Sequence, residues 1–431
     1  MFRRLSAKPR VTLLSAALPL FFICLLLSGC KKEKPAGENA NSETGQTAVV
    51  TEPKTDSATA AAAVINEQSS GVKAVSDSAG ILADNTARVL AGMKAIDTAG
   101  VKPGKGKILL ANWKRFSAKS ESTWRTFSSR HLEKVSAWSK EAMPDVQAAT
   151  DTLFYPFSGP DFVHAATFFP NAKVIYMFGL EPVGMQPDLS HPDSARMRGT
   201  YGAIDNSLHE ILNLSFFVTK EMLKDFRSND LHGNLTVLTL FLVRTGHTIH
   251  TMRFVQPDSS GILQTVAPAN DKMASNHGVE ITFSGSDGQA RTLYYFSVDL
   301  ADRYLVKNKA FIKYMASIPA GHTTYLKSAS YLLHYDTFRR MRKTVLDKSR
   351  YVFQDDTGVP LSYFSGGKYG NWEPTFYGNY TKPIPVFKLQ PEKDLAAIYA
   401  GDSLEKPAPL PFFIGYGHRK ESNLQIYRRK P

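Results

Sequence analysis

Two apolar runs and the short segment between them constrain the fold of this chain more than any other feature. Thr152–Phe157 and Lys173–Leu180 are apolar or aromatic and lack polar alternation, and Phe162–Phe169 between them suits a short helix. Gly159-Pro160 and Pro170-Asn171 supply the turns. Strand, helix and strand within about thirty residues predict a βαβ unit, and the missing alternation predicts a sheet that is covered on both faces.

The sequence around this unit predicts a mixed sheet. Val279–Phe283 and Arg291–Phe296 flank a turn with glycine and aspartate, which indicates an antiparallel hairpin. Ser207–Phe226 and Ser328–Lys348 have the apolar spacing of helices. We therefore expect one α/β domain with a mixed sheet over residues 76–431.

The segment beyond Gly358 is rich in glycine, proline and tyrosine, and we expect it to wrap the surface of the domain. Its aromatic residues could form a stacking platform for sugars, although such residues more often pack a loop-rich segment onto the core. They are Tyr363, Tyr369, Trp372, Phe376, Tyr377 and Tyr380.

The first thirty residues have the three parts of a secretory signal peptide. Four basic residues precede the uncharged apolar run Val11–Leu27, and the small residues Ser28 and Gly29 lead to Cys30. This ending resembles the bacterial lipoprotein precursors. The resemblance implies that residues 1–29 are removed and that Cys30 is acylated. The alternative is an uncleaved membrane helix, for which the run is at the short limit of roughly 17–25 residues.

Residues 30–75 are rich in alanine, serine, threonine and glutamate and have few aromatic residues. This composition cannot bury a core and predicts a disordered tether. The lipid anchor would then hold the domain at the membrane of the bacterial cell envelope. Lys31 follows the cysteine, and by resemblance to the enterobacterial sorting rule this favours the outer membrane.

The cysteine count excludes several kinds of chemistry. The chain has two cysteines, Cys24 in the leader and Cys30 at the lipidation site. The domain therefore has no thiol for a zinc site, a disulfide or a nucleophile.

The chain is basic, with a formal net charge of +13. Nucleic acid is a poor partner for an envelope protein, so we expect an anionic lipid, a glycan or another envelope protein. The competing interpretation is an ordinary solvated helix face and a basic tail. The late basic residues are Arg339, Arg340, Arg342, Lys343, Lys348, Arg350, Arg419, Lys420, Arg428, Arg429 and Lys430.

Polar residues follow both strands of the βαβ unit. Ser158 and Asp161 come after the first strand and Glu181 after the second, where open α/β sheets bind ligands. The arrangement resembles the nucleotide-binding part of methyltransferases, in which an acidic residue after the second strand holds a ribose. The glycine-rich turn is reduced here to Gly159-Pro160. The alternative is that Asp161 caps the following helix and that Glu181 belongs to a turn.

A second group of carboxylates is Asp355-Asp356, which we consider a candidate pair in a pocket. Asp356-Thr357-Gly358 resembles the triplet of aspartic proteases, but those enzymes need two apposed copies and the chain has one. The same residues are also good turn formers.

The sequence predicts no metal site and no cofactor. His247 and His250 lie three apart in a segment that suits a strand, so their side chains would point to opposite faces. His209-Glu210 is as consistent with an ordinary helix residue as with a ligand. The chain has no His-Glu-x-x-His pattern, no P-loop and no Gly-x-Ser-x-Gly elbow.

These observations favour a non-enzymatic binding or assembly module of the cell envelope. The alternative is an envelope hydrolase that uses two carboxylates among Asp161, Glu181, Asp355 and Asp356 as acid and base. The second possibility requires two of these acids to face one cleft.

Overall fold

The computed structural model describes residues 75–96, 107–189, 197–205, 233–268, 274–365, 370–401, 406–416 and 421–431. All of them belong to one compact unit, Thr55–Pro431. The predicted leader, Cys30, most of the tether, the helix expected at Ser207–Phe226 and the pair His209-Glu210 lie outside the described residues.

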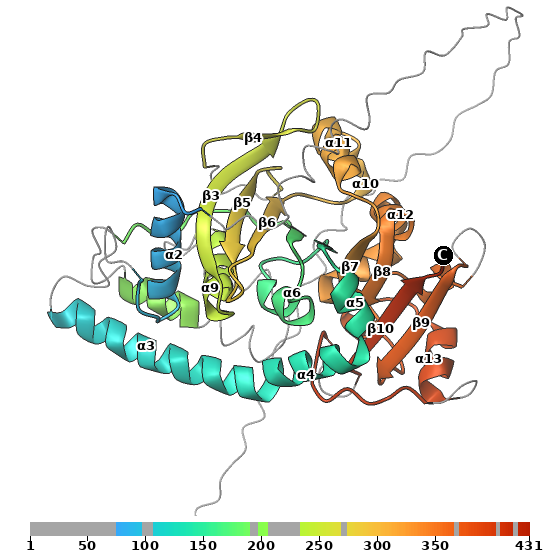
Figure 1. Cartoon of the computed structure of the whole chain (residues 1–431). Helices are drawn as coiled ribbons and strands as arrows, with labels where there is room; N and C mark the ends of the chain where they lie inside the picture. The colour runs from blue at the N-terminus through green and yellow to red at the C-terminus, as the bar shows by residue number, and fades with distance from the viewer. Residues whose placement is uncertain are drawn as a thin grey trace, which may run out of the picture. The chain divides into compact units, whose positions relative to one another are not determined.

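Ten strands form a single mixed sheet, which confirms the predicted α/β class (Figure 1). Their spatial order is β4-β3-β5-β6-β2-β1-β7-β8-β10-β9. In chain order the strands are β1 (Thr152–Tyr155), β2 (Val174–Gly179), β3 (Thr248–Pro257), β4 (Leu263–Thr265), β5 (Gly278–Ser284), β6 (Ala290–Ser297), β7 (His322–Leu326), β8 (Ser349–Gln354), β9 (Trp372–Gly378) and β10 (Asn423–Arg429).

The five central strands are parallel. β1 pairs with β2 and β7, β2 pairs with β6, and β7 pairs with β8. The helix α6 (Phe162–Phe168) joins β1 to β2, so the predicted βαβ unit is present. The predicted hairpin is present as β5 and β6, which pair antiparallel.

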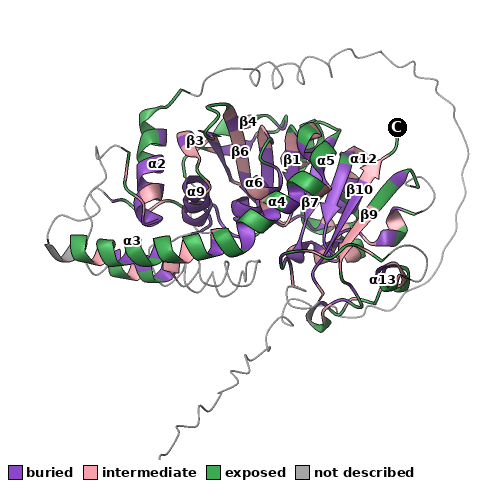
Figure 2. Ribbon diagram, turned by 60° about the horizontal axis from the view of Figure 1, so that its bottom comes forward, coloured by how far each residue is buried: buried purple, intermediate pink, exposed green. Residues whose placement is uncertain are grey.

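Helices cover both faces of the sheet (Figure 2). Adjacent residues of one strand enter different cores: Leu153 and Tyr155 pack in one hydrophobic cluster and Phe154 in the other. The first core includes residues of α2 (Ser78–Leu90), α3 (Lys107–Phe127), α4 (Glu133–Ala142), α5 (Pro144–Ala149), α6 and α9 (Leu235–Arg244). The second includes residues of α10 (Asp302–Leu305), α11 (Lys309–Ser317), α12 (Arg339–Lys348) and α13 (Lys393–Ala400).

Local sequence explains where α6 begins and ends. The Asp161 side chain accepts a hydrogen bond from the backbone N–H of His164 and caps the helix N-terminus. Pro170 follows the C-cap residue Phe169 and prevents the helix from continuing. The short helix therefore returns the chain to the amino end of β2 within the predicted distance.

Two sequence expectations for the C-terminal third are wrong. The chain beyond Gly358 does not only wrap the surface, because β10 is inserted between β8 and β9 and pairs antiparallel with both. The helix expected over Ser328–Lys348 is broken into two 3-10 turns, Ser328–His334 and Asp336–Phe338, and α12. Tyr335, between the two turns, has an extended backbone (φ −94°, ψ 145°), which is incompatible with a helix that continues through it.

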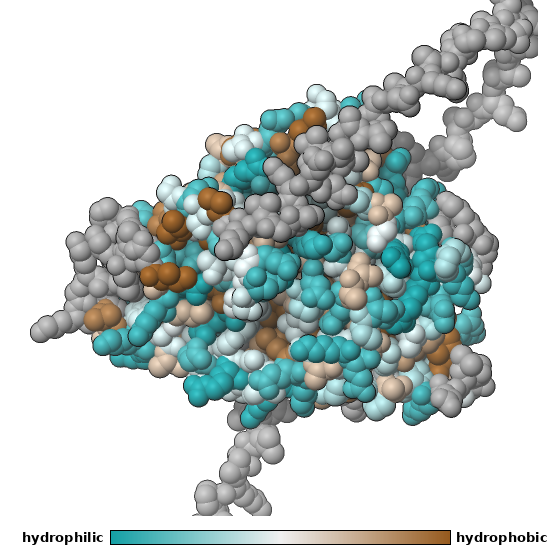
Figure 3. Space-filling model, viewed as in Figure 1, coloured by the Kyte–Doolittle hydropathy of each residue, from teal (hydrophilic) through white to brown (hydrophobic). Residues whose placement is uncertain are grey.

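The face of the molecule in Figure 3 is largely hydrophilic, with apolar residues in small separate groups. Among the described residues, none of the helices has the length and hydropathy needed to cross a bilayer.

Candidate functional site

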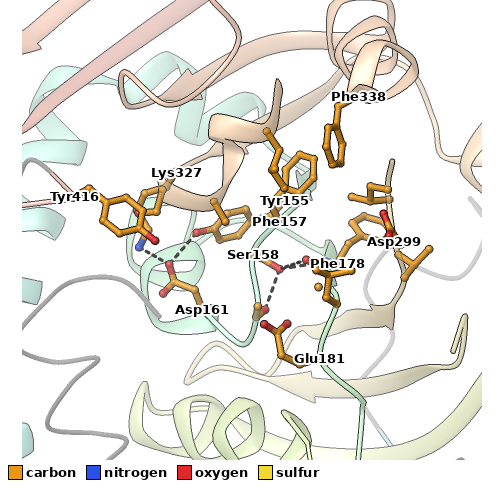
Figure 4. A pocket seen from close by; sticks show the side chains of 18 residues that line it. Tyr155, Phe157, Ser158, Asp161, Phe178, Glu181, Asp299, Lys327, Phe338 and Tyr416 are labelled. Atoms are coloured by element: carbon orange, nitrogen blue, oxygen red, sulfur yellow. Dashed lines mark hydrogen bonds and ion pairs between the residues drawn. The ribbon is translucent and has the colours of Figure 1, made fainter. Parts of the chain in front are cut away.

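A pocket lies at the carboxyl ends of the parallel strands (Figure 4). Its volume is about 110 Å³, somewhat less than the roughly 150 Å³ cavity that holds benzene in an engineered protein. The pocket is therefore large enough for one small ring or one part of a larger ligand. Residues that follow four different strands line it: Phe157, Ser158, Gly159 and Asp161 after β1; Leu180 and Glu181 after β2; Val298, Asp299 and Leu300 after β6; Lys327, Ser328 and Ala329 after β7.

The order in which strands are added to the sheet reverses at this pocket. The chain runs from β1 to β2 on one side, and later strands β7 and β8 are added on the other side of β1. Numbered along the chain, the five parallel strands have the spatial order 3-2-1-4-5, which is the order of doubly wound sheets. In such sheets ligands bind where the strand order reverses, at the carboxyl ends.

The backbone is strained at the same place. Phe157 and Ser328 both line the pocket, and both have a left-handed backbone, with φ of 59° and 60°. This conformation costs about 1–3 kcal/mol for residues other than glycine and is often found at functional sites. Gly159 (φ 52°) also lines the pocket, and a Cβ added to it would meet no atom within 4 Å.

Asp161 is the centre of a fully buried polar network. Oδ2 accepts hydrogen bonds from the Tyr155 hydroxyl at 2.8 Å and from Lys327 Nζ at 2.5 Å. Oδ1 lies 2.7 Å from Nδ1 of His164. Burial alone would raise the pKa of Asp161, but the interactions with His164 and with the charged Lys327 outweigh it and hold this pKa well below its usual value. Asp161 is therefore an ionised, saturated acceptor.

Two histidines extend the network away from the pocket. An ionised carboxylate only accepts, so Nδ1 of His164 carries a proton that it donates to Asp161. Burial lowers the pKa of His164 and lowers that of His131 to about 3, so both rings are neutral. Their Nε2 atoms are 3.0 Å apart, and His131 must therefore donate to His164.

The environment of Glu181 is the opposite of that of Asp161. It comes two residues after the end of β2, lines the pocket and is 7% exposed. Its carboxylate makes no hydrogen bond or ion pair with the residues that the structure describes, and Figure 4 shows its oxygens near Ser158 with no contact drawn to them. Neither oxygen is among the fully buried side-chain atoms that lack a partner, so the carboxylate opens to the pocket and can accept hydrogen bonds from a ligand there. This is the feature of the pocket that most clearly calls for a ligand.

Ser158 lines the pocket, but its hydroxyl makes hydrogen bonds to the backbone that stabilise the fold. Its Oγ accepts a hydrogen bond from the Phe178 backbone N–H at 3.1 Å and lies 2.9 Å from the Gly159 carbonyl oxygen, to which it can donate. These contacts fix the loop after β1 against the end of β2. Ser158 therefore positions the loop rather than presenting a free hydroxyl.

Asp355 and Asp356 are outside the pocket lining. Asp355 accepts hydrogen bonds from the backbone N–H groups of Ser328 at 3.1 Å and Thr357 at 3.0 Å, so it holds the strained Ser328 from behind the pocket wall. Asp356 accepts from the Asn423 side chain at 2.9 Å. Burial and then the charge of Asp355 raise the pKa of Asp356 to about 8. The pair is close in space, but it does not face Asp161 or Glu181 across the pocket.

Two residues of the site escaped the sequence analysis. Lys327 directly follows β7 and pairs with Asp161, and Asp299 comes two residues after β6 and lines the pocket. Each is a charged residue just after a parallel strand, as Glu181 is. The sequence of β7, His-Thr-Thr-Tyr-Leu, lacks the apolar run that marks β1 and β2, and the hairpin pattern of β6 does not reveal its parallel pairing with β2.

Several of the late basic residues form structural contacts. Arg342 is buried and contacts Asp336 at 3.3 Å, and Arg428 donates to both Asp145 oxygens at 2.7 and 3.1 Å. Lys348 donates to the carbonyls of Ala316 and Ile318 at the C-terminal end of α11. Arg419 and Lys420 lie outside the described residues.

The other candidates fit ordinary roles. His247 precedes β3 and His250 lies within it, and the described residues contain no group of three potential metal ligands. Trp372 and Tyr380 are buried in the second core, so these two aromatics do not form an exposed platform. Tyr369 falls in a part of the chain that the structure does not describe. Searches of protein-family models, of curated proteins and of solved structures each find no match for this chain.

Proposed function

We propose that this chain is a lipid-anchored binding protein of the bacterial cell envelope, and that its pocket binds a small molecule that carries a vicinal diol. A nucleoside and a sugar both offer this group. The observation that carries the proposal is the unpartnered carboxylate of Glu181 in the pocket at the strand-order reversal. The leader and Cys30 support the envelope location, as argued from the sequence.

The position of Glu181 suits a diol. In doubly wound sheets an acidic residue about twenty residues after the glycine turn accepts hydrogen bonds from ribose hydroxyls. Glu181 follows Gly159 at about that interval and lies just beyond the end of β2, after Leu180. Two hydroxyl donors would supply the hydrogen bonds that the carboxylate lacks.

The charge of the lining argues against phosphate groups. Asp161, Glu181 and Asp299 line the pocket, and Lys327, the one cation among the described residues that line it, already pairs with Asp161. Pro160 in the turn after β1 has no N–H to donate to a phosphate. We therefore expect neutral or cationic ligands and weak binding of nucleotides.

The hydrolase alternative has less support. It requires two carboxylates that face one bond, one of them able to hold a proton. Asp161 is saturated by donors, and its pKa is held low. Asp355 and Asp356 do not line the pocket.

The test is calorimetric titration of the chain 55–431 with four probes: adenosine, 2′-deoxyadenosine, N-acetylglucosamine and ATP. We expect adenosine or the sugar to bind, and we expect 2′-deoxyadenosine, which lacks the diol, and ATP to bind at least about tenfold more weakly than adenosine. Glu181→Gln should weaken the diol ligand by at least about tenfold. The matched control is Glu141→Gln on the exposed face of α4, which should leave binding unchanged. Absence of binding by both diol probes, or equal binding by Glu181→Gln, would contradict the proposal.

A further inference from the structure

Three helices next to the pocket form one continuous surface. α10 contacts both α11 and α12, and the backbone N–H of Arg340 donates to Asp302 at 3.0 Å, which joins α10 to α12. Figure 1 shows the three helices together on one side of the sheet. We call this surface the α10–α12 face and define it as the exposed residues of 302–313 and 336–343.

The α10–α12 face is strongly basic. Its exposed cations are Arg303, Lys307, Lys309, Lys313, Arg339, Arg340 and Lys343. The acids nearby have other partners: Asp302 accepts from the backbone of Arg340, Asp336 contacts the buried Arg342, and Asp347 pairs with Lys343. The side chains of Lys307, Lys309 and Arg339 make no ion pair within the part of the chain that the structure describes. The positive charge of the face is thus largely uncompensated.

Apolar groups project between these charges. Tyr304 and Val306 are each 44% exposed, and the Arg303 guanidinium lies 4.6 Å from the centre of the Tyr304 ring. Ile262, in the turn between β3 and β4, is 61% exposed. Lys313 Nζ donates to the Ser259 carbonyl of that turn at 2.8 Å, which places the turn beside α11. Basic side chains that surround a tyrosine and aliphatic residues are typical of surfaces that lie on a bilayer.

We propose that the α10–α12 face docks on an anionic lipid bilayer. Charge complementarity is the main reason, since each Lys or Arg near an anionic surface adds to attraction within a Debye length of about 10 Å. The sequence supplies a second reason. A flexible chain of about 45 residues between an anchor at Cys30 and the first described residue would span roughly 35–40 Å. A weak surface contact is enough at the high effective concentration that such a link produces.

Docking in this way places the rim of the pocket at the membrane surface. Asp299 and Leu300 line the pocket and directly precede α10, and Phe338 lines it and directly precedes α12. A ligand in the headgroup layer would therefore reach the pocket without diffusing through bulk solvent. Membrane docking itself rests on the basic face and not on the proposed ligand.

The experiment is sedimentation of the chain 55–431 with vesicles of phosphatidylcholine that contain about 30 mol% phosphatidylserine. The serine headgroup has no diol, so the result does not depend on the pocket. We expect binding to these vesicles, none to pure phosphatidylcholine, and a loss of at least about tenfold in Lys307→Glu, Lys309→Glu, Arg339→Glu. The control reverses the same number of charges on α3, far from the face: Lys114→Glu, Arg115→Glu, Arg125→Glu.

Two further arms decide between a bilayer and a simple anion site. Tyr304→Ser should weaken the binding that survives at about 500 mM salt, because the apolar contact is not screened. A soluble acidic polysaccharide should bind more weakly than the vesicles. The proposal fails if the wild-type chain does not sediment with anionic vesicles, if the α3 control loses as much binding as the face variant, or if the polysaccharide binds as well as the vesicles.

Discussion

The acids on the two walls of the pocket differ in their hydrogen-bond partners. On the wall formed by β1 and β7, Asp161 accepts from Tyr155 and Lys327 and contacts His164. On the wall formed by β2 and β6, Glu181 is nearly as buried, but it has no partner among the described residues. Both acids follow parallel strands of the same unit. The position of an acid just after a parallel strand brings it to the pocket. The residues around that acid then decide whether it is held in a structural network or stays available to a ligand.

The largest effect on stability should come from the wall formed by β1 and β7, where Asp161 is paired. Asp161→Asn leaves Lys327 buried without its counter-charge, so we expect the free energy of unfolding to fall by about 3–5 kcal/mol. Urea denaturation measures it. Asp151→Asn is the control, since Asp151 and Lys173 form an exposed ion pair worth about 0–1 kcal/mol. A loss of less than about 1 kcal/mol for Asp161→Asn would show that the network is not a structural requirement.

Lowering the pH should also destabilise the network around Asp161, through His131. His131 has a folded pKa of about 3, so below its usual value of 6.5 the unfolded chain takes up a proton that the folded chain refuses. The contribution is complete above pH 6.5 and is lost as the pH falls toward 3. We expect a loss on the order of 2–4 kcal/mol over this range, reduced in His131→Gln. Equal pH profiles of the two proteins would contradict this assignment.

A smaller effect tests the strain of the wall. Ser328→Gly relieves a left-handed backbone while keeping the N–H that donates to Asp355. We expect a gain of about 0.5–1 kcal/mol after the extra chain entropy of glycine is included. Thermal unfolding measures the change. A loss of stability would mean that the serine side chain, rather than the backbone, is what the site needs.

The smallest effect on stability should come from Glu181, on the wall formed by β2 and β6. Glu181→Gln removes a carboxylate that has no partner to lose, so stability should change by less than about 0.5 kcal/mol in the absence of a ligand. Urea denaturation beside the Asp161→Asn variant gives the direct comparison. A large destabilisation by Glu181→Gln would erase the distinction between the two walls.

The sequence was sufficient for the elements whose patterns are local. The βαβ unit could be predicted because two apolar runs and their turns lie within a short segment, and the same segment placed Ser158, Asp161 and Glu181 at one edge of the sheet. Which neighbours an acid would meet could not be predicted. Lys327 reaches Asp161 from β7, far along the chain, and that contact depends on the order of the strands.

The C-terminal third shows a different kind of failure. The strands β9 and β10 contain Pro374 and several polar or basic residues, so they resemble loop sequences. Their place in the sheet comes from pairing with β8 and with each other, which is a long-range effect. The helix expected over Ser328–Lys348 is interrupted because the spacing of apolar residues does not reveal the extended backbone at Tyr335.

The position of β10 has a consequence for how the protein is made. This strand comes after β9 in the chain, yet it lies between β8 and β9 in the sheet. While the chain is being synthesised, β9 has no strand to pair with until β10 emerges. The sheet is therefore completed last at its C-terminal edge.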